Sequence, residues 1–88
     1  MDTETRADVL KRMAYIEGHL AGVRRMIEDD VYCVDVLKQT YAVRRGIERM
    51  ESLMLDGHLH HCVVDAIEDG DREPVLRELI ELYELKNK

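Results

Sequence analysis

The residues VLKRMAYIEGHLAGVRRMI, from Val9 to Ile27, decide the fold class of this chain. Their apolar side chains recur at alternating intervals of four and three residues, the spacing of one face of an amphipathic helix. These side chains belong to Val9, Met13, Ile16, Leu20, Val23 and Ile27. The pattern predicts a long helix over residues 3–28. Acidic residues at 28–30 favour its end there, because negative charge opposes the dipole of a helix at its C-terminus.

A second apolar pattern of the same period runs from Val36 to Ile67 and predicts a helix over residues 32–68. The turn sequence Asp69-Gly70-Asp71, followed by Pro74, predicts a short third helix over residues 73–85. Gly57 lies inside the second helix, where it indicates either close packing of helix backbones or a hinge. We therefore expect an all-α, three-helix protomer with two long antiparallel helices, forming a single domain over residues 1–88.

The composition indicates a small helical core. Hydrophobic residues make up 45% of the 88 residues, with no Phe or Trp. A domain of this size buries only about 60–65% of the surface that its unfolded chain exposes, so self-association is expected. No apolar stretch reaches the ~18 residues of a membrane helix, and the N-terminus has no apolar signal region. We expect a cytoplasmic protein with no membrane partner, in which the two cysteines are reactive or bind metal rather than form a disulfide.

Cys33, His58 and Cys62 are the candidate metal ligands. His58 and Cys62 are four residues apart, so on one α-helix they share a face. Cys33 lies 25 residues before His58, which on a continuous helix is a separation of roughly 37 Å. A two-fold antiparallel partner would bring its own Cys33 to His58 and Cys62, making two equivalent sites per dimer. Two thiolates and one imidazole favour Cu(I), with Zn(II) a weaker candidate that needs water as a fourth ligand.

The charge of the chain is unevenly distributed. Its net charge is −6, but residues 1–50 carry nine basic and nine acidic side chains, so the excess acid lies in residues 51–88. A DNA-binding surface requires that the basic residues of the first half gather on one face.

Two strings carry a family resemblance: VYCVDVLKQ at residues 31–39 and GHLHHC at residues 57–62. With IEGH at 16–19 and RMIE at 25–28, they resemble the copper-sensing repressor (CsoR) family. The resemblance implies an antiparallel dimer, then a flat tetramer built as a dimer of dimers. It also implies that the metal-free protein binds operator DNA and releases it on binding Cu(I), with no catalysis. The family's ligands match Cys33 of one protomer and His58 with Cys62 of the other.

The resemblance also assigns roles around the metal and at the DNA. Tyr32 and Glu78 match the residues that surround the ligating His, where a carboxylate would orient a metal-bound imidazole. The DNA-binding positions match Arg12 and Arg49, and the patch could be enlarged by Lys11, Arg44 and Arg45. Such contacts would be mainly to phosphates, because no helix-turn-helix is evident. Ala14 and Tyr15 depart from the family's more basic pattern and weaken this face.

Several alternatives stay open at this point. Relatives that sense nickel or cobalt replace the residue at Cys62 by His, and persulfide-sensing relatives lack the residue at His58. A thiol-oxidation sensor would join Cys33 and Cys62 of two chains through sulfur. A thiol enzyme is disfavoured, because the chain offers neither a Gly-rich loop nor an evident oxyanion site. His60 and His61 are expected to be exposed or partly buried helix residues rather than ligands.

Overall fold

The computed structural model describes all residues, 1–88, as an all-helical chain. Helix α1 spans Thr3–Glu28 and α2 spans Cys33–His58. A five-residue π-helix, η1, follows at Leu59–Val63, then α3 at Val64–Glu68 and α4 at Arg72–Lys86. The predicted first and third helices are confirmed to within a residue or two. The predicted second helix begins and ends nearly as expected but is wrong in one respect, because a π turn interrupts its α-helical hydrogen bonds.

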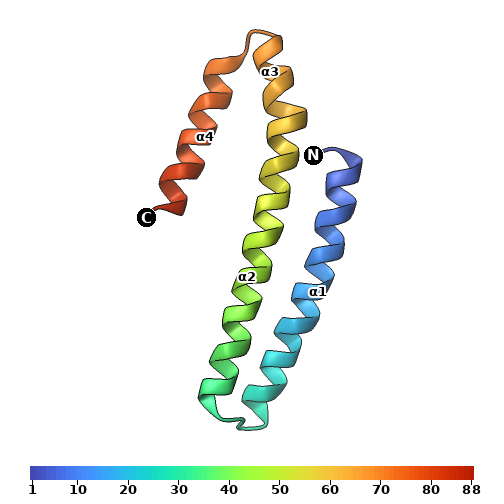
Figure 1. The fold of residues 1–88 in the computed structure, drawn as a ribbon, viewed down its shortest axis with the longest axis vertical. Helices are drawn as coiled ribbons and strands as arrows, with labels where there is room; N and C mark the ends of the chain where they lie inside the picture. The colour runs from blue at the N-terminus through green and yellow to red at the C-terminus, as the bar shows by residue number, and fades with distance from the viewer.

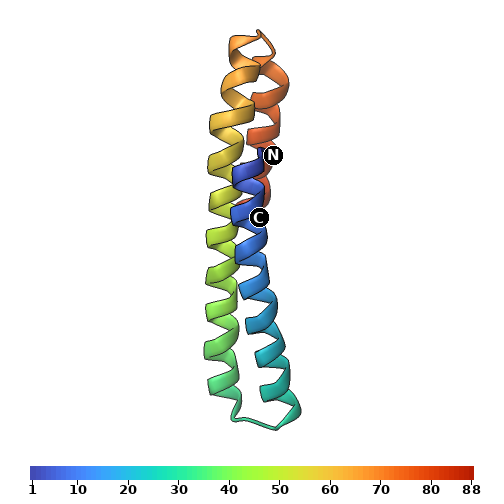
Figure 2. The same ribbon diagram turned by 90° about the vertical axis from the view of Figure 1, so that its right-hand side faces the viewer.

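The helices lie side by side in a single layer. The continuous segment formed by α2, η1 and α3 lies at the centre, with α1 antiparallel to it on one side and α4 on the other (Figure 1). Seen edge-on, the three segments overlap, and the molecule is about one helix thick (Figure 2). Its extents are 56 × 30 × 13 Å. The radius of gyration is 17.3 Å, whereas a compact chain of this length would have about 12 Å.

The α1–α2 contact buries only part of the apolar pattern. In α1, Val9 and Val23 are buried and Ile16 is half-buried against α2, whose Val43 is also buried. The alternate α1 positions remain exposed, at 37% for Met13, 54% for Leu20 and 60% for Ile27. The apolar face predicted for this helix is therefore only partly buried within the chain, because α2 covers one of its two apolar stripes. None of the helices combines the length and apolar character needed to cross a membrane.

The same type of C-terminal cap ends α1 and α3. At α1, Asp30 has φ 54°, and the N–H of Val31 donates to the carbonyl of Met26 at 3.0 Å. At α3, Gly70 has φ 87°, and the N–H of Asp71 donates to the carbonyl of Ala66 at 2.8 Å. A residue in the left-handed region lets the chain turn back onto the last carbonyls, which is the Schellman arrangement. The two caps set the lengths of the long segments.

Candidate metal centre and DNA-binding surface

The candidate ligands lie at opposite ends of the central segment. Cys33 is the first residue of α2 and His58 is its last, and no break lies between them. A helix of that length separates them by roughly 37 Å. Cys33 and Cys62 are both free and exposed. Within one chain, no three His, Cys, Asp or Glu side chains lie close enough to hold a metal ion.

Cys62 lies in the π-helix rather than in a regular α-helix. The N–H of Val64 donates to the carbonyl of Leu59, five residues back, as a π turn requires. The His60 side chain uses one backbone acceptor in this segment, because its Nδ1 donates to the carbonyl of Asp56 at 2.9 Å. That carbonyl is the acceptor that the His60 N–H would use in a regular helix. Single π turns of this kind occur often at functional sites.

His58 borders a groove that opens toward α4. The groove has a volume of about 450 Å³ and is lined by residues of α2 and α4 and by Met1. Its α4 residues are Leu82 and Lys86. Glu78, one turn earlier on α4, is exposed. Tyr32 precedes Cys33 at the far end of α2 and is 70% exposed. The structure therefore does not bring Tyr32 and His58 of one chain together.

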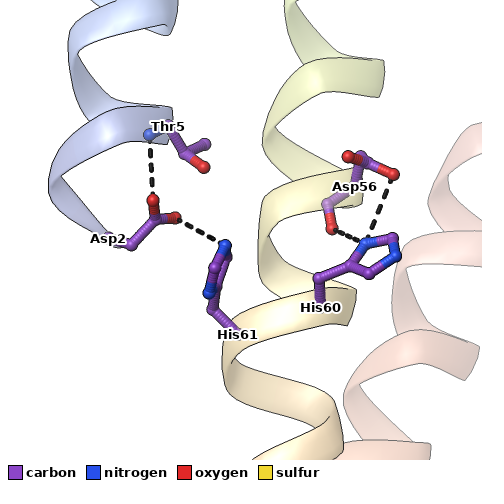
Figure 3. Close-up of polar contacts among 5 residues, drawn as sticks. All are labelled: Asp2, Thr5, Asp56, His60 and His61. Carbon is purple, nitrogen blue, oxygen red and sulfur yellow. Dashed lines mark hydrogen bonds and ion pairs between the residues drawn. The ribbon is translucent and has the colours of Figure 1, made fainter.

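The N-terminus of α1 packs against the segment that holds Cys62 (Figure 3). Asp2 caps α1, its Oδ2 accepting from the N–H of Thr5 at 3.0 Å. Its other oxygen, Oδ1, is buried, has no hydrogen-bond partner, and lies 3.7 Å from Nε2 of His61. Hydrogen bonds from the Thr5 side chain and backbone, together with the charge of His61, lower the pKa of Asp2. Beside this contact, the buried Thr5 packs directly on Gly57.

His60 and His61 point to different sides of the central segment. His61 faces the N-terminus of α1, whereas His60 points to the other side and contacts Asp56 of α2 (Figure 3). Both are exposed, as expected from the sequence. The contact of His61 with Asp2 is one that sequence reasoning missed. Asp2 has the residue type and position of a helix N-cap, but no sequence pattern predicts its contact with a residue 59 positions later.

The basic residues of α1 and α2 gather along one groove. Arg12, Arg45 and Arg49 together line a hollow of about 310 Å³ between the two helices and also a second hollow beside it. Lys11 lines a third hollow, which shares Arg12. At the first hollow, His19 Nε2 donates to Gln39 Oε1 at 2.8 Å and joins α1 to α2.

Arg44 lies outside these hollows. Its guanidinium stacks over the ring of Tyr41, 5.2 Å from the ring centroid. None of the five predicted DNA-binding residues forms an ion pair within the chain. Asp8 and Glu48 line two of the hollows but form no ion pair with these basic side chains.

The sequence and the fold both match known proteins. The family profile described as "Metal-sensitive transcriptional repressor" matches residues 5–85. This chain belongs to that family. It is 40% identical over 75 residues to the copper-sensing transcriptional repressor CsoR of Bacillus subtilis (strain 168), covering 85% of this chain and 74% of that protein. It is 42% identical over 79 residues to CsoR of Mycobacterium tuberculosis (strain ATCC 25618 / H37Rv), covering 90% of this chain and 66% of the relative.

Two solved structures of related regulators share the fold. The copper-sensing repressor CsoR with Cu(I) from Geobacillus thermodenitrificans NG80-2 matches with a TM-score of 0.93 and 35% identity, over 100% of this chain and 92% of that one. The nickel-responsive transcriptional regulator InrS matches with a TM-score of 0.77 and 36% identity, over 89% of this chain and 88% of that one. The predicted resemblance and the all-α fold are confirmed. The metal-sensitive repressors are regulators of transcription, so the prediction that this protein is not an enzyme is also confirmed.

Proposed function

We propose that this metal-sensitive repressor binds operator DNA without metal and releases it on binding Cu(I) at a site shared between two protomers. Cys33 of one protomer and His58 with Cys62 of the other are the ligands. The observation that carries the proposal is the unbroken α2 helix, which puts Cys33 at one end and His58 at the other. An antiparallel partner places the two ends together, and it does so twice in each dimer. A repressor acts at its operator, so this function belongs in the cytoplasm.

The donor set fits Cu(I). Thiolate and imidazole are ligands that a soft ion accepts at low coordination number, while Zn(II) would need a fourth donor. Cys33 and Cys62 are free and exposed, so both thiols are available at the ends of the central segment. The copper-sensing relatives and the Cu(I)-bound structural match support the choice of copper.

Assembly is part of the proposal, and the uncovered apolar stripes support it. Met13, Leu20 and Ile27 form an exposed stripe along α1, and Leu37 and Ile47 are exposed on α2. A second copy of the α1–α2 pair would cover these side chains and produce a four-helix core. Tetramer formation, as a dimer of dimers, would then use surfaces outside that core. The 88 residues would act throughout as one domain.

Tyr32 and Glu78 complete the metal environment in this proposal. Tyr32 adjoins Cys33, so the same antiparallel pairing that delivers Cys33 delivers Tyr32 to the partner's His58. Glu78 lies on α4, which borders the groove beside His58. Its carboxylate would accept the second N–H of the metal-bound imidazole and draw α4 toward α2.

The DNA-binding face comprises Lys11, Arg12, Arg45 and Arg49, with Arg44 at its edge. Three of the arginines line one groove, and none of these basic side chains is neutralised by an ion pair. An array of this kind suits phosphate contacts, which give affinity that falls steeply with salt. The excess of acidic over basic residues lies in residues 51–88, outside α1.

One experiment tests the proposal directly. Reduced protein is titrated with Cu(I) against a competing chelator while the anisotropy of labelled DNA from its own promoter is followed. We expect one Cu(I) per protomer and loss of DNA binding at that stoichiometry. Absence of tight binding, or tight binding with unchanged DNA affinity, contradicts the proposal.

A nickel-responsive function is the second candidate, because InrS shares the fold at 36% identity. Thiol oxidation is a third, supported by the two free, exposed cysteines. The same DNA assay with Ni(II), Zn(II) or a persulfide donor in place of Cu(I) separates these candidates. Release by one of them at a concentration where Cu(I) has no effect would replace the copper assignment.

A further inference from the structure

We propose that Asp2, Thr5, Gly57 and His61 form a clasp that holds the π turn of Cys62 against α1 and transmits metal binding to the DNA-binding part of α1. The clasp lies within one chain and involves none of the proposed ligands directly. Its role in release rests on the proposed function, whereas its role in holding the π turn does not.

The first half of the clasp is the contact between Thr5 and Gly57. Thr5 is 8% exposed and Gly57 is buried, although most of this chain is exposed. A Cβ built on Gly57 would lie 2.5 Å from Thr5 Oγ1 and 2.7 Å from Thr5 Cγ2. Only glycine leaves room for α1 to approach here, immediately before His58 and the π turn. The first turn of α1 is thus packed against the backbone that leads into the metal segment.

The second half of the clasp is the contact between Asp2 and His61. Asp2 Oδ2 is occupied by the N–H of Thr5, and the buried Oδ1 is left facing His61 Nε2 at 3.7 Å. A buried carboxylate oxygen without a hydrogen bond is rare, and an imidazole N–H is a suitable donor for one. His61 precedes Cys62 directly, so this contact restrains the backbone that presents the thiol.

Helix α1 connects the clasp to the basic groove. Helix α1 continues without a break from Thr3 to Glu28. Lys11 and Arg12 lie six and seven residues after Thr5, about 10 Å along the helix at the usual rise per residue. Arg12 shares its groove with Arg45 and Arg49 of α2. A shift of the π turn on metal binding would therefore move the start of α1 relative to α2 and alter the spacing of these arginines.

The test compares two clasp variants with two matched controls in the full chain. The clasp variants are Asp2→Asn, which keeps a side chain able to cap α1, and His61→Ala. The controls are Glu4→Gln, an exposed acid in the same turn, and Glu68→Ala, which truncates an exposed side chain on α3 of the same central segment. Hydrogen exchange of the amides at residues 59–63 is measured without metal, and DNA affinity is measured with and without Cu(I).

We expect faster exchange at residues 59–63 in both clasp variants and in neither control, because local opening is then easier. We expect the ratio of DNA affinities without and with Cu(I) to fall about twofold to fivefold, the scale of a partly exposed ion pair. The double variant should lose little more than either single variant, since both remove one contact.

Three results decide the proposal. Exchange and affinity ratios equal to those of the controls overturn it. Weaker metal-free DNA binding with an unchanged ratio shows that the contact is only structural and overturns the coupling. If the unmodified protein neither binds Cu(I) nor releases DNA, the proposed function fails, and the exchange measurement still accepts or rejects the clasp by itself.

Discussion

Cys33 and His58 are the first and the last residues of the same unbroken α-helix. This relationship makes any site that contains both of them a product of assembly, because a helix cannot bring its own ends together. The proposed copper site can therefore be tested by mixing two variant proteins that each lack different ligands.

Mixing two defective proteins should restore metal binding. Cys33→Ser and the double variant His58→Ala/Cys62→Ser should each lose the tight Cu(I) site. In a mixed antiparallel dimer, one of the two sites regains all three ligands. Random subunit exchange makes half of the dimers mixed, so about one quarter of the original capacity should return. Chelator competition measures this capacity before and after mixing. No recovery, when differently tagged subunits are shown to have exchanged, would place the ligands within one chain.

Gly57→Ala should destabilise the protein although alanine favours helices. The added Cβ meets Thr5 atoms at 2.5 and 2.7 Å, and overpacking of this kind costs about 1–3 kcal/mol. Thermal or urea unfolding measures the loss. Thr5→Ala in the same chain should recover part of it, because the two closest atoms are removed.

Gly18→Ala provides the matched control for this prediction. Nothing lies within 4 Å of a Cβ at Gly18, so the substitution should stabilise α1 by up to about 1 kcal/mol. Equal effects of the two substitutions on unfolding would show that the approach of Thr5 to Gly57 is not tight.

Acid should remove the contribution of Asp2 to stability. Its pKa is lowered from an ordinary value of 3.8 in the folded chain, mainly by the hydrogen bonds from Thr5. The unfolded chain therefore takes up this proton first as the pH falls. The stabilisation is present above pH 3.8 and is lost as the pH falls through the lower folded-state value. The difference in Tm between the original protein and Asp2→Asn should shrink from about pH 6 to about pH 3. A constant difference across this range contradicts the prediction.

The helices were predictable from the sequence because their signals are periodic and local. The four-and-three spacing from Val9 to Ile27 and the turn around Gly70 place the three segments within a residue or two of their observed bounds. The spacing does not indicate which apolar stripe of α1 packs against α2 of the same chain. Met13, Leu20 and Ile27 match the pattern as well as Val9 and Val23 do, yet α2 covers only the latter two.

The surroundings of the candidate metal site were less predictable. At the π turn, the imidazole of His60 contacts the carbonyl of Asp56, the acceptor that the His60 N–H would use in a regular helix. The contact between Asp2 and His61 joins residues that only the α1–α2 pairing brings together. Hydrophobic periodicity contains neither kind of information. The metal ligands stay a prediction from spacing and resemblance, because the proposed site needs a cysteine from a second chain.

The position of each arginine relative to the groove predicts how much its loss weakens DNA binding. Arg45→Gln and Arg49→Gln remove charges that line one hollow with Arg12, whereas Arg44→Gln removes a charge that stacks on Tyr41 outside it. Both groove variants should weaken operator binding and reduce the slope of log affinity against log salt by about one for each lost phosphate contact. Arg44→Gln should change the slope less. Anisotropy titrations of labelled promoter DNA at several salt concentrations give the slopes. If all three variants change them equally, DNA contacts extend along α2 beyond the groove; if none does, the DNA-binding face lies elsewhere on the molecule.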